Sequence, residues 1–322
     1  MRRNGFMKLS LVIPCYNEEQ NVRPMYEACC AVLGAAVPSF EMIFINDGSS
    51  DGTWACLEEL YEADKAHVRL VDFSRNFGKE AAMYAGLQRA AGDYVTIIDA
   101  DLQQRPEVAL EMVRFLDANP DYDCVAAYQA ERHEGVFTKL CKKVFYKIIN
   151  IACQTPIRPD ASDFRTFRRP MVEAVLAMKE YHRFSKGIFS FVGFTVHYMP
   201  YTAEARHTGR STWSFWKLFR YAKEGIASFT TFPLRIATLM GSVMSVLSLA
   251  YLIVVVVQRL AYGIDVPGYA TIVALILLIG GLQMIMLGII GSYVARIYVQ
   301  SKQRPLYIAR EYRGGDAEED AE

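Results

Sequence analysis

Tyr94-Val95-Thr96-Ile97-Ile98-Asp99-Ala100-Asp101-Leu102-Gln103 joins a short apolar run to two carboxylates. A run this short and rich in β-branched residues predicts a buried strand. Ligands of open α/β sheets bind beyond the carboxyl ends of the strands. Because side chains alternate along an extended chain, Asp99 and Asp101 are expected to point the same way. The stretch therefore predicts a ligand site at one edge of an α/β sheet.

Two convergent carboxylates repel each other unless a positive charge lies between them. A divalent cation that carries a diphosphate meets this requirement, because Mg²⁺ uses one or two carboxylates together with substrate phosphates. The alternative is a strand-end turn that is merely rich in aspartate, since Asp-x-Asp alone is a common pattern. The neighbouring segments favour the cation.

Short β-branched runs and helical patterns alternate on both sides of this stretch. The runs predict strands at 9–13, 40–45, 68–73, 94–99 and 124–128, and the patterns predict helices at 20–33, 54–64, 80–91 and 106–119. This alternation is typical of an α/β domain with a mostly parallel, doubly wound sheet. The polar clusters Asn46–Thr53 and Ser74–Lys79 also follow predicted strands, so one shared site is expected.

The pattern changes beyond residue 130. Residues 137–153 predict a basic amphipathic helix, which suits either a membrane surface or packing on the domain. An extended segment at 162–165 and a strand at 194–199 follow, and 213–231 predicts a second helix with aromatic and basic faces. The chain after residue 130 therefore combines the end of the domain with candidate membrane-surface helices.

Two uncharged runs, Ile236–Val257 and Tyr269–Val294, are long enough to span a bilayer. Their outer flanks are basic and the link between them is short, which predicts that both flanks lie in the cytoplasm. Gly241/Ser245 and Gly288/Ser292 allow close helix packing within or between chains, so a homo-oligomer is expected. The acidic stretch 314–322 is expected to be disordered.

The overall composition limits the classes of protein to which this chain can belong. The 322 residues carry 35 basic and 35 acidic side chains, and this balance does not favour a nucleic-acid binder. The seven cysteines include no Cys-x-x-Cys pair and indicate reduced thiols in a cytosolic domain. The 52% hydrophobic content is high for a soluble protein and fits a membrane anchor.

Five motifs occur in order along the chain: Val12–Glu18, Asn46–Thr53, Ser74–Lys79, Asp99–Gln103 and Ser162–Arg165. Together they resemble the family 2 glycosyltransferases of GT-A fold. Within that family the chain resembles the polyprenyl-phosphate sugar transferases of the dolichyl-phosphate mannose synthase-like group. With its two predicted spans, it is most similar to the bactoprenol glucosyltransferases. The resemblance implies a Rossmann-like catalytic domain over 1–212, a juxtamembrane helix at 213–234, two spans within 235–295 and a cytoplasmic tail at 296–322.

The resemblance also implies roles for individual residues. The donor nucleotide sugar would be held by Pro14, Tyr16, Glu18, Asp47, Lys79, Asp99, Ala100 and Arg206. Mg²⁺ or Mn²⁺ would be held by Asp101 with Gln103 beside it, and the acceptor phosphate by Arg132, Lys139 and Arg165. Asp163, Asp101 and Asp99 would form the catalytic group. A capped turn around Pro14 and a solvated basic face at Arg132 and Lys139 remain the simpler alternatives.

The family resemblance casts Asp163 as the catalytic base, and the chemistry of the acceptor qualifies this role. A phosphate monoester has a second pKa near 6, so most of the acceptor is already dianionic at pH 7. A nearby carboxylate would repel a dianion unless Arg165, Arg132 or the metal compensates. A mixed role is therefore expected, in which Asp163 takes a residual proton and orients the acceptor or a sugar hydroxyl.

The function implied is transfer of a hexose from a nucleotide diphosphate sugar, with UDP-glucose expected, to undecaprenyl phosphate at the inner membrane. The resemblance also implies that the configuration at the anomeric carbon inverts and that the product serves cell-envelope glycosylation. One rival is a processive polysaccharide synthase, although two spans make a poor channel and the Gln-x-x-Arg-Trp motif is absent. The other is a non-catalytic nucleotide-sugar-binding membrane scaffold, which the intact Asp99, Asp101 and Asp163 disfavour.

Overall fold

The computed structural model describes residues 8–129, 161–202, 232–262 and 268–314. The predicted helices at 137–153 and 213–231 lie outside these ranges. The chain forms two compact units, one of Met1–Arg220 with Pro305–Glu322 and the other of Tyr221–Arg304. The chain therefore leaves the first unit, forms the second, and then returns to the first.

A mixed sheet of eight strands forms the centre of the first unit, in the order β7-β5-β6-β4-β1-β2-β3-β8. The strands are β1 (Lys8–Cys15), β2 (Ser39–Asn46), β3 (Val68–Phe73), β4 (Tyr94–Ile97), β5 (Cys124–Gln129), β6 (Ala161–Arg168), β7 (Val196–Tyr201) and β8 (Ala309–Arg313). Strands β4, β1, β2 and β3 run parallel, whereas β6 pairs antiparallel with both β4 and β5, and β8 pairs antiparallel with β3. The predicted α/β class is confirmed, and the sheet is more mixed than predicted because β6 and β8 reverse direction.

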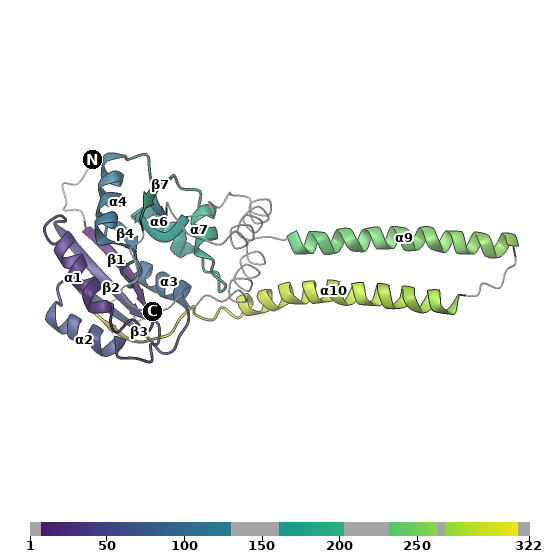
Figure 1. Ribbon diagram of the computed structural model, residues 1–322, viewed down its shortest axis with the longest axis horizontal. Coiled ribbons are helices and arrows are strands. Elements are labelled where there is room, and N and C mark those ends of the chain that lie inside the picture. Colours follow the sequence, from purple (N-terminus) through teal and green to yellow (C-terminus); the bar gives the residue numbers. More distant parts are fainter. Residues whose placement is uncertain (1–7, 130–160, 203–231, 263–267, 315–322) are drawn as a thin grey trace. The chain divides into compact units, whose positions relative to one another are not determined.

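Helices cover both faces of this sheet (Figure 1). They are α1 (Val22–Leu33), α2 (Thr53–Ala63), α3 (Lys79–Arg89), α4 (Pro106–Ala118), α6 (Arg169–Ala177) and α7 (Ser185–Phe191). The core on one face combines α1, α2 and α4 with alternate residues of β1 and β2. Helix α3 packs on β1 and β2 from the other face, together with α6. The four helices predicted between residues 20 and 119 are present as α1 to α4, whereas α6 and α7 were not predicted.

A glycine lets α3 lie close against the sheet. A Cβ atom at Gly86 would lie 2.2 Å from Cγ1 of Val12 and 2.8 Å from Cδ1 of Ile45. Real Cβ atoms do not approach other atoms this closely, so a side chain at this position would push the helix away. The close packing of α3 fixes its first residue, Lys79, at the carboxyl edge of the parallel strands.

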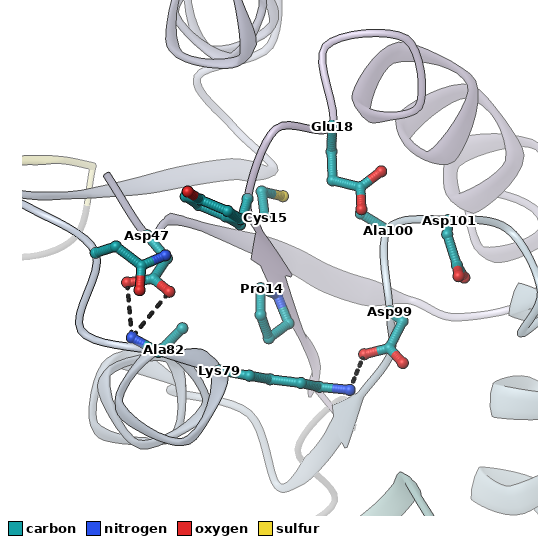
Figure 2. Close-up of a pocket in the computed structure, with 12 residues that line it drawn as sticks. Pro14, Cys15, Glu18, Asp47, Lys79, Ala82, Asp99, Ala100 and Asp101 are labelled. Carbon is teal, nitrogen blue, oxygen red and sulfur yellow. Dashed lines mark hydrogen bonds and ion pairs between the residues drawn. The ribbon is translucent and has the colours of Figure 1, made fainter. Parts of the chain in front are cut away.

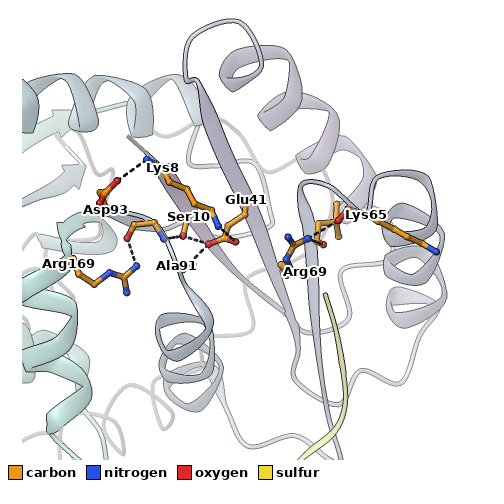
Figure 3. Close-up of polar contacts among 10 residues, drawn as sticks. Lys8, Ser10, Glu41, Lys65, Arg69, Ala91, Asp93 and Arg169 are labelled. Carbon is orange, nitrogen blue, oxygen red and sulfur yellow. Dashed lines mark hydrogen bonds and ion pairs between the residues drawn. The ribbon is translucent and has the colours of Figure 1, made fainter. Parts of the chain in front are cut away.

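A buried carboxylate joins β1, β2 and the end of α3 near the start of the strands. Glu41 is 3% exposed and accepts hydrogen bonds from Lys8 Nζ at 2.9 Å, Ser10 Oγ at 2.6 Å and Ala91 N at 2.8 Å (Figure 3). Burial acts to raise the pKa of Glu41, but these donors outweigh it and hold the pKa below its ordinary value. The carboxylate is therefore ionised at neutral pH and stabilises this edge of the sheet.

The strand β8 was not predicted. Residues 309–313, Ala-Arg-Glu-Tyr-Arg, contain three charged side chains and no apolar face, which gave no strand signal. Their backbone instead completes the edge of β3, pairing Leu70 with Arg313 and Phe73 with Ala309. Part of the predicted tail at 296–322 therefore belongs to the eight-stranded sheet.

The second unit contains α9 (Phe232–Tyr262) and α10 (Tyr269–Ser301). The stretches Ile236–Gln258 and Leu278–Ser301 are long and apolar enough to cross a membrane. Large apolar side chains such as Leu247 are exposed along both helices. An apolar surface of this extent is suited to a bilayer and not to water.

Candidate active site

A cleft of about 300 Å³ opens at the carboxyl ends of β1, β2 and β4 (Figure 2). It is lined by Pro14, Cys15, Tyr16, Glu18, Asp47, Asn76, Gly78, Lys79, Ala82, Asp99, Ala100 and Asp101. All of these residues except Ala82, which lies on α3, come from four of the five motifs found in the sequence. The described residues predicted to hold the donor all lie in this lining, so the sheet brings together the strand-end clusters as expected.

Asp99 is fixed by two neighbours. Its Oδ1 lies 2.6 Å from Lys79 Nζ, and its Oδ2 accepts a hydrogen bond from Gln104 Nε2 at 3.0 Å. The Asp99 backbone N–H donates to Gln104 Oε1 at 2.9 Å, so the buried Gln104 amide holds this residue at two points. Both Asp99 oxygens are therefore engaged on the protein side of the cleft.

Asp101 lies further along the same turn, at the lip of the cleft. Its Oδ1 accepts the backbone N–H of Gln103 at 3.2 Å. The next residue, Leu102, has a φ of 59°, a left-handed conformation that is costly for a bulky side chain. This turn changes the direction of the chain after Asp101. Strained turns of this kind are common at ligand sites.

The donor set fits a cation that is shared with a diphosphate. Among the described residues, no three His, Cys, Asp or Glu side chains gather to form a complete metal site. Asp101 supplies one carboxylate, and the charge of Asp99 is already balanced by Lys79. A cation held here would therefore need oxygen ligands from its substrate, which is how Mg²⁺ commonly binds in proteins.

Asp47 closes the opposite wall of the cleft. Its carboxylate accepts the backbone N–H of Phe77 at 2.7 Å and that of Gly78 at 3.1 and 3.0 Å. Burial raises the pKa of Asp47 to about 6, although these two N–H groups act in the opposite direction. Gly48 allows the close approach, because it has a φ of +63° and a Cβ there would lie 2.4 Å from the Arg75 backbone.

Asp163 lies on the other side of Lys79, with its Oδ2 3.7 Å from Lys79 Nζ. Burial acts to raise the pKa of Asp163, but the positive charges of Lys79, Lys186 and Arg165 outweigh it and leave the pKa below its ordinary value. Asp163 is therefore an ionised carboxylate at neutral pH. One lysine thus lies between a carboxylate of the donor cleft and Asp163.

Arg165 lies in the interior of the first unit. The residue is 4% exposed, its Nε donates to the Ser162 carbonyl at 3.0 Å, and its guanidinium lies 4.9 Å from the centre of the Phe189 ring. The other cations predicted for the phosphates, Arg132, Lys139 and Arg206, are outside the described residues. Their predicted roles remain predictions.

Three residues that support the site were not predicted. Glu80, next to Lys79, accepts hydrogen bonds from the Ser185 backbone N–H and from its hydroxyl, and so joins α7 to α3. Gln104 holds Asp99 as described above. Gln104 directly follows the Asp99–Gln103 motif, and this adjacency in the sequence could have indicated its role. The pairing of Glu80 with Ser185 spans 105 positions, and no sequence pattern indicates it.

Two family models match this chain. Residues 10–176 match the model of glycosyl transferase family 2, and residues 232–297 match the GtrB C-terminal hairpin. An uncharacterized glycosyltransferase of Synechocystis is 40% identical over 309 residues, or 96% of each chain. The bactoprenol glucosyl transferase of Shigella phage SfV is 38% identical over 94% of this chain and 98% of its own.

Solved structures of lower identity were also compared. Glucosyl-3-phosphoglycerate synthase from Mycobacterium tuberculosis, in complex with Mn²⁺, UDP-glucose and phosphoglyceric acid, is 19% identical, with a TM-score of 0.46. The match covers 69% of this chain and 78% of that one. The family model spans more than half of this chain, and the hairpin match covers α9 and all but the last four residues of α10. The chain therefore belongs to glycosyltransferase family 2.

Proposed function

We propose that this protein transfers glucose from UDP-glucose to undecaprenyl phosphate on the cytoplasmic face of the membrane. The observation that carries this proposal is the near full-length match to bactoprenol glucosyl transferases, which includes both the strand-end motifs and the hairpin. A phosphate oxygen of the acceptor would attack the anomeric carbon from the face opposite UDP. The bond from that carbon to the diphosphate would break, its electron pair would leave with UDP, and the configuration would invert.

The donor would lie along the cleft with its base against Asp47. The Asp47 carboxylate can accept a hydrogen bond from the N–H group of uracil. Pro14, Tyr16 and Glu18 would enclose the nucleoside. Tyr16 is 49% exposed and so has a ring face free for a base. Lys79, Asp99 and Ala100 would lie beside the diphosphate and the sugar.

Asp101 is proposed as the metal ligand, with Gln103 beside it and the diphosphate completing the coordination. When bound, Mg²⁺ or Mn²⁺ would neutralise the charge that develops on the leaving diphosphate. Arg206 would add a cation on the same side, because a guanidinium binds phosphate oxygens in a bidentate manner.

Asp163 is proposed to orient the acceptor more than to accept its proton. A carboxylate with a lowered pKa is a weak base, and the acceptor phosphate is largely dianionic at pH 7. The repulsion between the dianion and Asp163 would be offset by Lys79, 3.7 Å away, and by Lys186. Arg132 and Lys139 are proposed to hold the phosphate itself.

Both ends of the hairpin are proposed to lie in the cytoplasm. The return of β8 to the catalytic sheet requires an even number of crossings between residues 220 and 305, and the basic flanks favour the cytoplasmic side. A Cβ at Gly241 would lie 3.5 Å from Met286, whereas one at Gly288 would meet nothing within 4 Å. The open side of Gly288 supports packing against a second copy.

The topology can be tested with single cysteines in a variant that lacks the native ones. A membrane-impermeant thiol reagent added to whole cells should label a cysteine at Val266 and should not label one at Gly314. Labelling at Gly314 without labelling at Val266 would reverse the proposed orientation.

The transfer reaction itself can be followed with UDP-[¹⁴C]glucose and undecaprenyl phosphate in detergent. Label should enter a chloroform-soluble product that mild acid releases as glucose, because the product is a lipid phosphomonosaccharide. A processive synthase would instead give a water-soluble polymer, and a scaffold would bind the donor without turnover. Either of these results would refute the proposal.

The role of Asp101 predicts a strong effect of a nearly isosteric change. Asp101→Asn removes the anionic ligand, and kcat should fall at least about 100-fold because a Lewis acid contributes several kcal/mol. EDTA should abolish wild-type turnover, and added Mn²⁺ should restore it. Asp117→Asn, which lies on α4 away from the cleft, is the control and should remain active. Full activity in EDTA would contradict the metal assignment.

A further inference from the structure

We infer that the segment after the second membrane helix positions the wall of the donor cleft, with Tyr307 and Arg310 as the positioning residues. This inference rests on the proposed function, since it takes the cleft to be the donor site. The wall in question is the loop Ser74–Gly78, which joins β3 to α3 and contributes Asn76 and Gly78 to the cleft. The returning chain holds this loop by backbone, aromatic and ionic contacts.

The backbone contact lies at the point where β3 becomes the loop. β8 pairs with β3 up to Phe73, and the Ser74 N–H then donates to the Ile308 carbonyl at 2.9 Å. Arg310 Nη2 lies 3.4 Å from the Ser74 carbonyl. Without this partner strand, the edge of β3 and the start of the loop would lose their hydrogen bonds.

The aromatic contact extends from the returning segment into the cleft wall. The Tyr307 ring stacks on Phe73 with centroids 4.7 Å apart, and Phe73 meets Phe77 edge to face at 5.7 Å. Phe77 is the residue whose backbone N–H is bound by Asp47. The Tyr307 hydroxyl donates to Gln88 Oε1 at 3.0 Å, which fixes the ring against α3. Loss of the Tyr307 ring would expose Phe73 and loosen the support of Phe77.

The ionic contact reaches the other wall. Asp72 is 2% exposed, and a carboxylate this deeply buried requires a partner. Arg310 Nη1 lies 3.3 Å from Asp72 Oδ2, while Asp72 Oδ1 accepts from Asn46 Nδ2 at 2.7 Å. Asn46 directly precedes Asp47 and its Oδ1 accepts the Ser49 N–H at 3.2 Å. Arg310 therefore compensates the negative charge of Asp72. The Asp72 carboxylate in turn holds Asn46 and the turn beside Asp47.

The consequence is that the donor cleft is completed by residues made after both membrane helices. β8 begins eight positions beyond Ser301, the last residue of α10. A catalytic domain that ends before the hairpin would contain every predicted donor-binding residue and still lack the support of its Ser74–Gly78 wall. The segment therefore contributes to donor binding in addition to anchoring the chain.

The strand itself supplies a matched control. Arg313 lies on the same strand and forms ion pairs with Glu58 at 2.5 Å and Glu311 at 2.6 Å. It pairs with Leu70, near the start of β3 and away from the loop. Replacing Arg313 thus removes a salt-bridged arginine from β8 without touching the Ser74–Gly78 loop.

The test measures UDP binding to the full-length protein in detergent by titration calorimetry with Mn²⁺ present, alongside thermal unfolding. Arg310→Gln and Tyr307→Leu should each raise the Kd for UDP by about 2- to 30-fold, the range expected for a coupled residue outside the ligand contacts. Arg313→Gln should bind UDP like the wild type. In turnover assays the KM for the donor should rise more than kcat falls.

Two outcomes separate this inference from the proposed function. If Arg310→Gln and Tyr307→Leu remain folded and bind UDP as tightly as Arg313→Gln, the inference is wrong and the proposed function is unaffected. If the wild type binds UDP but transfers no glucose to the lipid, the proposed function fails while the inference stands. If one of these two variants unfolds, the other provides the measurement, and a Kd for UDP equal to that of Arg313→Gln would overturn the inference.

Discussion

The ammonium group of Lys79 is the charge on which the arrangement of the site depends. It lies 2.6 Å from Asp99 and 3.7 Å from Asp163, two carboxylates that come from different strands and would otherwise repel each other. Burial acts to lower the pKa of Lys79, and the two carboxylates outweigh this effect and raise it. Lys79 is in place because α3 packs tightly on the sheet through Gly86 and begins at the carboxyl edge. The packing of α3 on the sheet thus determines the electrostatics of the cleft.

Much of this arrangement could be predicted from the sequence, because it follows from local patterns. The strand before Asp99, the polar clusters at strand ends and the four helices each depend on a few adjacent residues. Parallel strands then bring their ends together without further information. The two apolar helices could be predicted equally well, since the length and composition of a membrane span can be recognised in the sequence.

Two of the features that were missed are long-range. The contact of Glu80 with Ser185 and the return of β8 to β3 join residues separated by more than 100 positions. β8 gave no signal because its stability comes from the free edge of β3 and from the partners of Tyr307 and Arg310. Arg165 differs from these, because its burial could not be predicted from its motif. The motif predicts a phosphate ligand, and this role stays a prediction for a guanidinium that is buried beside Ser162 and Phe189.

The central claim is that Asp163 acts as an ionised, orienting carboxylate held by Lys79. The most direct test compares the pH dependence of kcat for the wild type and Asp163→Asn between pH 6 and 8.5. An orienting carboxylate predicts a loss of rate that is nearly constant across this range, because the folded-state pKa of Asp163 lies below it. Recovery of the variant toward the wild-type rate at pH 8.5, where the acceptor needs no base, would contradict the claim and identify Asp163 as a proton acceptor.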